Sequence, residues 1–188
     1  MKIILGSSSK WRQQILQEAG IEFTVCSPDI DEKAIRHEDP KELVRLIAHA
    51  KNDAVLLKIQ DPSLVITSDQ VTVFEGVIRE KPESEEEARM FLRSYSNAMV
   101  QTVTGVCVSN TETKELREGM DVAEVYFDTI PDHAIDLLIR QGDVMTCAGG
   151  FVTDNPLLDP YVKEIRGAKD SVIGMPLELT LSLLKQVQ

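Results

Sequence analysis

The chain has 188 residues and 43% of them are hydrophobic, so it is long enough to bury a core of its own without disulfides or a structural metal. Its formal net charge of -11 argues against a nucleic acid duplex or a membrane surface as a partner, because both usually bind broad basic surfaces. No apolar stretch is long enough to span a membrane, and the first residues lack the plan of a secretory signal. We therefore expect a cytoplasmic protein.

The cysteines are three in number, widely spaced and without a C-x-x-C pair. This pattern predicts neither a disulfide framework nor a zinc site, and we expect Cys26, Cys107 and Cys147 to be core thiols. The three histidines are too scattered along the chain to predict a metal cluster or a Ser-His-Asp triad.

The first predicted elements are a short apolar strand over residues 2–5 and a helix over residues 13–19, with a Ser-rich turn between them. Ser7, Ser8 and Ser9 can cap the helix, and Arg12 adds a cation to the free N–H groups of its first turn. Such a turn can bind a phosphate. An ordinary Ser-capped helix with a surface Arg and a half-buried Trp explains the same residues.

The next elements are a strand over residues 22–26, an acidic loop over residues 28–32 and a long helix over residues 40–58. The helix start is marked by Asp39 as N-cap and Pro40 at the first helical position. Its apolar residues recur on one face, and Lys51 lies outside that face, where it could be a solvated side chain.

Further along, an apolar strand over residues 64–67 runs into Asp69, and residues 71–74 turn at Glu75-Gly76 towards residues 77–78 as a hairpin. Ser84 begins a helix with an acidic first turn. Two strands, over residues 101–109 and 121–127, precede helices over residues 132–140 and 177–186. Hairpins and crossover helices together predict an α/β fold with a mixed sheet and flanking helices, formed by a single domain over residues 1–188.

Asp69 is the residue most difficult to explain by structure alone, because an acid directly after an apolar strand needs solvent or a partner. Asp31-Glu32, Lys51 and Glu80-Lys81-Pro82 are weaker candidates, since each has an ordinary surface explanation.

The ordered set of motifs resembles the Maf family of nucleoside triphosphate pyrophosphatases over essentially the whole chain. The motifs on which this resemblance rests are Leu5-Gly-Ser-Ser-Ser-Lys-Trp-Arg12, Asp31-Glu32, Ala48-x-x-Lys51, Ile66-Thr-Ser-Asp69-Gln-Val71, Lys81-Pro82, Ala123-Glu-Val-Tyr-Phe127, Cys147-Ala-Gly-Gly-Phe151 and Val172-Ile-Gly-Met-Pro176. The resemblance implies an inosine triphosphatase-like (Maf and Ham1) architecture, elongated, with a central cleft that two lobes of the domain would flank. It also suggests a homodimer.

The resemblance implies hydrolysis between the α and β phosphates of a nucleoside triphosphate, with a divalent cation, Mg²⁺ or Mn²⁺, as cofactor. Asp69 would be the proton acceptor, and Lys51, Lys81 and Arg12 would neutralise the triphosphate and the leaving pyrophosphate. Ser7 and Ser8 would bind phosphate oxygens. Glu32 would bind the substrate, and Glu32 and Asp69 together would hold the metal ion.

Three positions resemble the branch of the family that hydrolyses 7-methyl-GTP, namely Trp11, Gln70 and Asp154. An indole ring stacks favourably on a cationic methylated guanine, and a carboxylate can accept from the guanine N1–H and N2–H₂ edge. Asp154 replaces the usual Glu and reaches one methylene less. The alternatives are the same hydrolysis of dTTP or UTP, and a nucleotide-binding regulator of cell division with little turnover. Packing is the alternative explanation of Trp11, and a turn before Asn155-Pro156 is the alternative explanation of Asp154.

Overall fold

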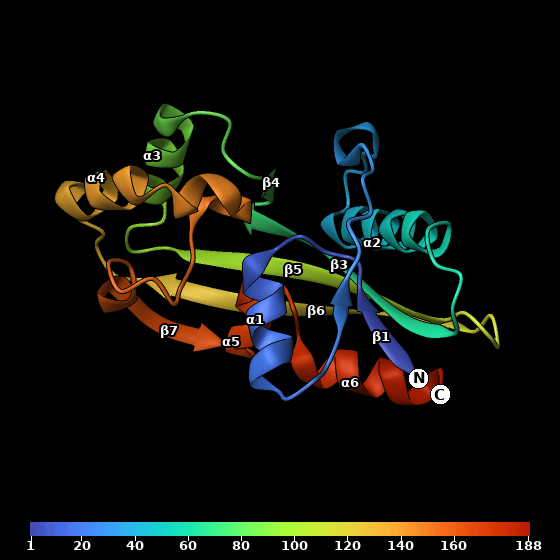
Figure 1. Ribbon diagram of the computed structural model, residues 1–188. Helices are drawn as coiled ribbons and strands as arrows, with labels where there is room; N and C mark the ends of the chain where they lie inside the picture. Colours follow the sequence, from blue (N-terminus) through green and yellow to red (C-terminus); the bar gives the residue numbers. More distant parts are fainter. The chain divides into compact units, whose positions relative to one another are not determined.

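The computed structural model describes residues 1–188, and its strands form one seven-stranded mixed sheet (Figure 1). The strand order is β2-β1-β3-β5-β6-β7, and β4 pairs with β3. Strand β1 is parallel to β2 and β3, whereas the β3–β4 and β6–β7 pairs are antiparallel. The strands are β1 (Lys2–Leu5), β2 (Thr24–Val25), β3 (Ser63–Phe74), β4 (Val77–Arg79), β5 (Met99–Asn110), β6 (Leu116–Phe127) and β7 (Val162–Arg166).

Six α-helices accompany the sheet, together with short 3₁₀ turns, one of which spans Glu32–Ala34. The helices are α1 (Lys10–Glu18), α2 (Pro40–Leu56), α3 (Glu85–Ser94), α4 (Asp132–Gln141), α5 (Lys169–Ile173) and α6 (Leu177–Gln186). No helix is both long and apolar enough to cross a membrane.

The chain divides into two compact units, and the three longest strands contribute residues to both. The first unit comprises residues 1–70, 104–121 and 174–188, and the second unit comprises residues 71–103 and 122–173. The cleft that the family resemblance implies stays a prediction.

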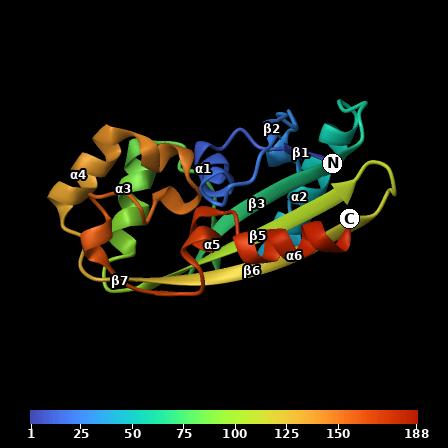
Figure 2. The ribbon, with the colours of Figure 1, turned by 60° about the horizontal axis from the view of Figure 1, so that its bottom comes forward.

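In the first unit, α2 and α6 pack on the sheet through apolar faces and a few buried polar contacts. The Thr67 hydroxyl on β3 donates to the Ala48 carbonyl on α2 at 2.7 Å. Asn110 at the end of β5 donates to the Val187 carbonyl just after α6, which lies along β5 and β6 in Figure 2. The bond from Thr67 to Ala48 fixes α2 against the strand that carries Asp69.

In the second unit, α3 and α4 lie side by side (Figure 2). They pack over a large core that includes an aromatic cluster. Tyr95 lies at its centre, with its ring centroid 5.4 to 6.0 Å from those of Phe74, Phe127 and Phe151. The Tyr95 hydroxyl donates to the Gly149 carbonyl at 2.9 Å, and burial raises the pKa of Tyr95 to about 12. This contact fixes the segment around Gly149 against the core.

Most predicted elements are confirmed, but several bounds differ and two elements were not predicted. Helix α1 begins at Lys10, three residues earlier than predicted, because Ser9 is its N-cap and the helix follows directly from it. Only Thr24–Val25 of the second predicted strand pair with the sheet. Strand β3 continues through Asp69 to Phe74. The strand at Val162–Arg166 and the short helix at Lys169–Ile173 have no counterpart in the predictions.

The three cysteines are free thiols, but only Cys107 is buried. Cys26 and Cys147 are partly exposed, so the prediction of three core thiols is wrong for these two. Both lie in short connecting segments outside the helices and strands, where the backbone runs near the surface.

Candidate functional site

The turn between β1 and α1 lies beside the middle of β3 because the two strands are parallel and Leu5 pairs with Ile66. Beyond that pair the Gly6 N–H donates to the Ile66 carbonyl at 2.7 Å. Parallel neighbours bring their carboxyl ends to one edge of a sheet, which is where α/β proteins place ligand sites. The Ser-rich turn and the Ser68-Asp69-Gln70 segment are therefore adjacent.

The three serines of the turn have different roles. Ser9 is the helix N-cap, and its hydroxyl accepts from the Arg12 N–H. Ser7 is buried and its hydroxyl accepts from the Ser9 N–H at 3.2 Å, whereas Ser8 is exposed. The cap that the sequence predicts is confirmed, and Ser8 presents its hydroxyl to solvent at the first turn of α1.

Lys51 and Asp69 form a buried ion pair between α2 and β3. Their Nζ and Oδ1 atoms are 2.7 Å apart, and the side chains are 7% and 8% exposed. Lys51 Nζ is also 3.1 Å from Glu32 Oε1, in the 3₁₀ turn that follows the acidic loop. Lys51 is thus no solvated side chain, and its ammonium group joins the two carboxylates that the sequence analysis singles out.

Burial raises the pKa of Asp69 above the ordinary value of an aspartate. The positive charges of Lys51 and Arg12 oppose this rise, and the negative charge of Glu32 adds to it. A carboxylate whose pKa is raised in this way accepts a proton more readily than a solvated aspartate.

A second group of contacts lies around Gly174, in the segment between α5 and α6. The Ser68 hydroxyl donates to the Gly174 carbonyl at 2.8 Å, and the Arg12 guanidinium donates to the Ser68 carbonyl. Gln70 Nε2 donates to the Thr104 hydroxyl on β5 at 2.9 Å. Since side chains alternate along a strand, Ser68 and Gln70 point to one face of β3.

Asp69 points to the opposite face, towards α2, as Thr67 does. The site therefore has two parts on the two sides of one strand, a Lys51–Asp69–Glu32 cluster and an Arg12–Ser68–Gly174–Gln70 cluster. The charge of Arg12 nevertheless influences the pKa of Asp69, so the two parts are electrostatically coupled.

Trp11 is half-buried on α1, and its indole N–H is buried without a hydrogen-bond partner. The ammonium group of Lys10 lies 4.7 Å from the centroid of the Trp11 ring. A cation at this distance is attracted by the indole face. The ring is therefore in a position to interact with positive charge in the folded protein.

Lys81 and Asp154 belong to the second unit, whereas the other predicted site residues belong to the first. Lys81 is exposed in the loop after β4. Asp154 is exposed too, and its carboxylate is 3.8 Å from Lys169 Nζ. The neighbouring turn is made by Asn155, whose side chain accepts from the Leu157 N–H, so forming that turn does not require the Asp154 carboxylate.

No group of three or more histidine, cysteine or acidic side chains is arranged to hold a metal ion. Glu32 and Asp69 are the two carboxylates that approach one cationic centre, the Lys51 ammonium. Mg²⁺ commonly takes only one or two carboxylates and completes its shell with water and substrate phosphates. The residues present fit an ion of that kind.

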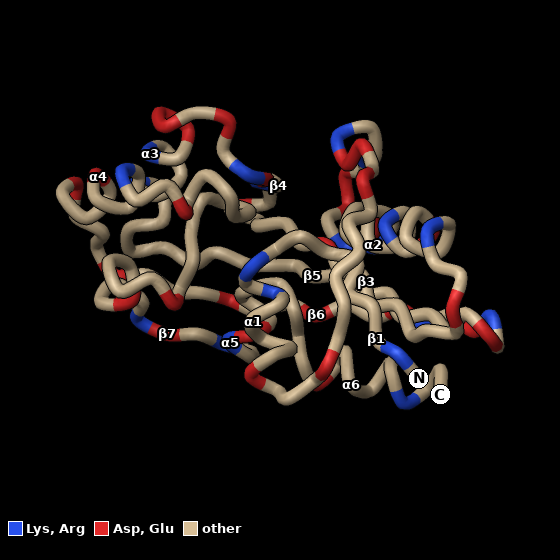
Figure 3. The backbone as a smooth tube through the Cα atoms, viewed as in Figure 1, with Lys and Arg blue, Asp and Glu red and all other residues tan.

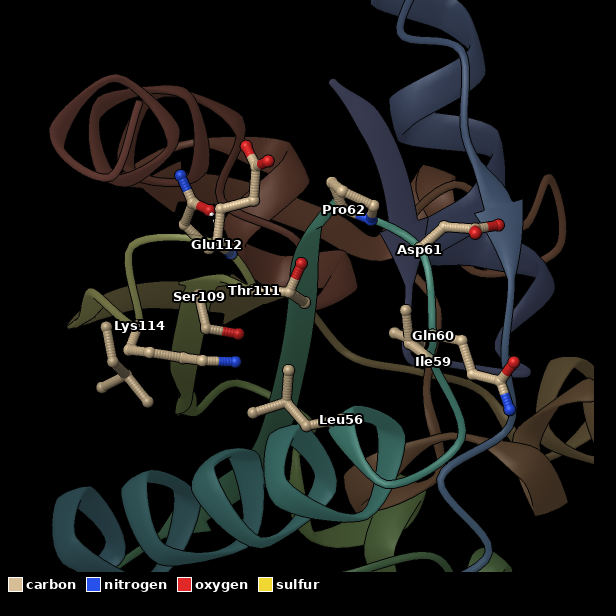
Figure 4. Close-up of a pocket in the computed structure, with 11 residues that line it drawn as sticks. Leu56, Ile59, Gln60, Asp61, Pro62, Ser109, Thr111, Glu112 and Lys114 are labelled. Carbon is tan, nitrogen blue, oxygen red and sulfur yellow. Dashed lines mark hydrogen bonds between the residues drawn. The ribbon is translucent and has the colours of Figure 1, made fainter.

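The cavity drawn in Figure 4 is elsewhere in the first unit, near the end of α2 and the β5–β6 turn. Its volume is about 400 Å³, and Leu56, Ile59 and Pro62 form apolar parts of its wall. None of the predicted site residues lines it. The candidate site is instead an arrangement of side chains around β3.

Basic residues of the first unit occur at the start of α1 and along α2, among many acidic segments (Figure 3). Arg12 and Lys51 contribute cations from these two helices to the candidate site. The acidic composition of the chain therefore coexists with a local group of cations suited to a small polyanion.

Thr104 is not among the site residues predicted from the sequence. Ser68 and Gly174 were included only as members of longer motifs. Ser68 and Gly174 are 106 positions apart, and their hydrogen bond depends on the fold. The sequence signal that could have pointed to Gly174 is the segment Val172-Ile-Gly-Met-Pro176, in which a glycine precedes the start of a helix.

Comparison with known proteins gives a family model, described as Maf-like protein, that matches residues 2–187. The chain is 46% identical to the 7-methyl-GTP pyrophosphatase of Dictyostelium discoideum, over 98% of this chain and 96% of that protein. It is 33% identical to the 7-methyl-GTP pyrophosphatase of Idiomarina loihiensis, over 98% and 94% respectively. The Ham1 protein of Staphylococcus aureus superposes with a TM-score of 0.50 at 12% identity, over 99% and 97%, which confirms the predicted fold class.

Proposed function

Because the chain belongs to the Maf family, we propose that it hydrolyses 7-methyl-GTP to 7-methyl-GMP and pyrophosphate. The buried Lys51–Asp69 pair is the observation that carries this proposal, since it provides a base next to a phosphate-neutralising cation. The 46% identity to the 7-methyl-GTP pyrophosphatase of Dictyostelium discoideum supports the choice of nucleotide.

In the proposed reaction, Asp69 accepts a proton from the water that attacks the α-phosphorus. The bond between that phosphorus and the oxygen bridging to the β-phosphorus breaks, and pyrophosphate leaves. Lys51, Arg12 and Lys81 are proposed to neutralise charge that builds on the phosphates. Ser8 and N–H groups at the start of α1 bind a phosphate oxygen, with Ser7 and Ser9 holding the turn in place.

We also assign a Mg²⁺ ion, or Mn²⁺ in its place, to Glu32 and Asp69, with the remaining ligands from water and substrate. When bound, such an ion polarises the phosphate oxygens and withdraws charge from the reacting phosphorus. Lys51 Nζ contacts both carboxylates and so holds them close together.

Trp11, Gln70 and Asp154 recognise the base in this proposal. N7-methylation makes guanine cationic, and the Trp11 ring already attracts the Lys10 ammonium. Asp154 is exposed and can accept from two guanine N–H groups. Gln70 supplies an amide that can both donate to and accept from a base edge.

The test is pyrophosphate release from 7-methyl-GTP, GTP, dTTP and UTP, with and without Mg²⁺, by wild type and Asp69→Asn. We expect 7-methyl-GTP to be the best substrate and Asp69→Asn to lower kcat by about 10²- to 10⁴-fold. Asp29→Asn is a matched control, because Asp29 forms an exposed pair with Lys58 at 2.6 Å. Faster hydrolysis of dTTP or UTP would contradict the assigned substrate, and full turnover by Asp69→Asn would contradict the assigned base.

A further inference from the structure

We infer that Thr104 and Gly174 are positioning residues that hold Gln70 in the orientation from which it selects the base. This inference rests on the proposed function, in which Gln70 contacts the base. The two residues act on Gln70 differently, one through a hydrogen bond and the other through close packing. They belong to β5 and to the segment before α6, so only the fold brings them to this side chain.

The hydrogen bond fixes one end of the Gln70 amide. Gln70 Nε2 donates to Thr104 Oγ1 at 2.9 Å, and Thr104 is fully buried. A buried hydroxyl on a central strand has little freedom to move, so it determines which way the amide plane faces. The Oε1 atom is then left on the side of Gly174.

Close packing limits the other end of the amide. A Cβ atom on Gly174 would lie 3.2 Å from both Cδ and Oε1 of Gln70, and 3.4 Å from Nε of Arg12. Gly174 also has φ +96°, a backbone conformation that L side chains rarely adopt. Its carbonyl accepts from the Ser68 hydroxyl, which keeps the turn at this distance from β3.

Displacement of Gln70 should change substrate choice more than turnover. Asp69 points to the other face of β3, and its contact with Lys51 involves neither Thr104 nor Gly174. A variant that releases Gln70 therefore keeps the ion pair that activates water. The sensitive quantity is the ratio of kcat/KM for the two nucleotides that wild type distinguishes most strongly.

Thr104→Val tests the hydrogen bond, because it removes the hydroxyl at almost constant volume. We expect the selectivity ratio to fall about three- to tenfold, the range that corresponds to one hydrogen bond. Thr104→Ser keeps the hydroxyl and should restore the ratio to within about twofold of wild type. Thr102→Val is the matched control, since Thr102 lies on the same strand and its buried hydroxyl has no partner. Equal ratios in Thr104→Val and Thr102→Val would overturn the inference.

Gly174→Ala tests the packing, with Gly142→Ala as a control for backbone strain alone. Gly142 has φ +85°, and a Cβ there would meet nothing within 4 Å. We expect Gly174→Ala to lower the selectivity ratio in wild type but not in the Gln70→Ala background, because contacting residues couple and distant ones do not. An equal effect in both backgrounds would contradict a role through Gln70.

The wild-type nucleotide panel keeps this test separate from the proposed function. If wild type prefers a nucleotide other than 7-methyl-GTP, the proposed substrate is wrong, and the same variants are compared on the two nucleotides that it does distinguish. If turnover is absent, calorimetric dissociation constants for those two nucleotides replace kcat/KM. An unchanged ratio in Thr104→Val and Gly174→Ala would refute the inference in either case.

Discussion

Replacement of Lys51 by Met should shift the pH dependence of hydrolysis, because Lys51 is the largest influence that lowers the pKa of Asp69. The ammonium group lies 2.7 Å from Asp69 Oδ1 in a buried environment. Without it, desolvation of the carboxylate is opposed mainly by Arg12, and the pKa of Asp69 rises further above its ordinary range. The base is then ionised only at higher pH.

The size of the effect follows from the cost of an unpaired buried charge. Breaking a buried ion pair by removing one partner costs about 3 to 5 kcal/mol. If protonation of Asp69 relieves that cost, the acid limb of the kcat/KM profile moves up by about 2 to 4 pH units, at 1.36 kcal/mol for each unit.

Stability provides a second measurement that does not depend on activity. A carboxyl group whose folded-state pKa is raised stabilises the fold below its unfolded-state pKa and loses that contribution as pH rises through the folded-state pKa. Lys51→Met raises the folded-state pKa of Asp69, so the pH range over which this contribution is lost extends to higher pH. Its loss in the free energy of unfolding, measured with urea, should therefore be larger at about pH 8 than at about pH 5.

Lys58→Met is the matched control, since Lys58 forms an ion pair of similar length with Asp29 on the surface. Exposed pairs contribute about 0 to 1 kcal/mol, so neither the pH profile nor the stability should change appreciably. An acid limb of Lys51→Met that coincides with that of wild type would refute the electrostatic coupling between Lys51 and Asp69.

Three further substitutions probe the base site and the second unit. Trp11→Ala should lower kcat/KM about 2- to 30-fold more for 7-methyl-GTP than for GTP, the range of a cation–π contact, and equal losses would indicate packing instead. Asp154→Ala should reduce the preference for GTP over UTP, and an unchanged preference would remove Asp154 from base recognition. Arg79→Met should lower the free energy of unfolding in urea by about 1 to 3 kcal/mol. The Arg79 guanidinium lies 4.4 to 5.0 Å from three aromatic ring centroids and donates a hydrogen bond to the Ser94 hydroxyl. An unchanged free energy of unfolding would contradict a stabilising role for Arg79.

Local signals in the sequence were sufficient for most helices and for the class of the sheet. Asp39 with Pro40 marks the start of α2, and Ser84 marks the start of α3, because capping depends on neighbouring residues alone. Membership of the Maf family also follows from the order of motifs along the chain, and the family model confirms it.

Boundaries that depend on sheet pairing were predicted less well. The position of Asp69 after an apolar run predicts that it follows the end of a strand. It lies instead within the twelve-residue β3. A charged residue is accommodated there because Lys51, on the neighbouring helix, supplies the opposite charge. Hydropathy along the chain contains no information about a partner 18 positions away.

The sequence by itself determined most of the elements, the mixed α/β class, the family and the residue types that the chemistry needs. Only the tertiary structure decided which of those residues meet: Lys51 with Asp69 and Glu32 on one face of β3, and Arg12 with Ser68, Gly174 and Gln70 on the other. The physical reason is that caps and periodicity act over a few residues, whereas ion pairs and packing join side chains that are distant in the chain.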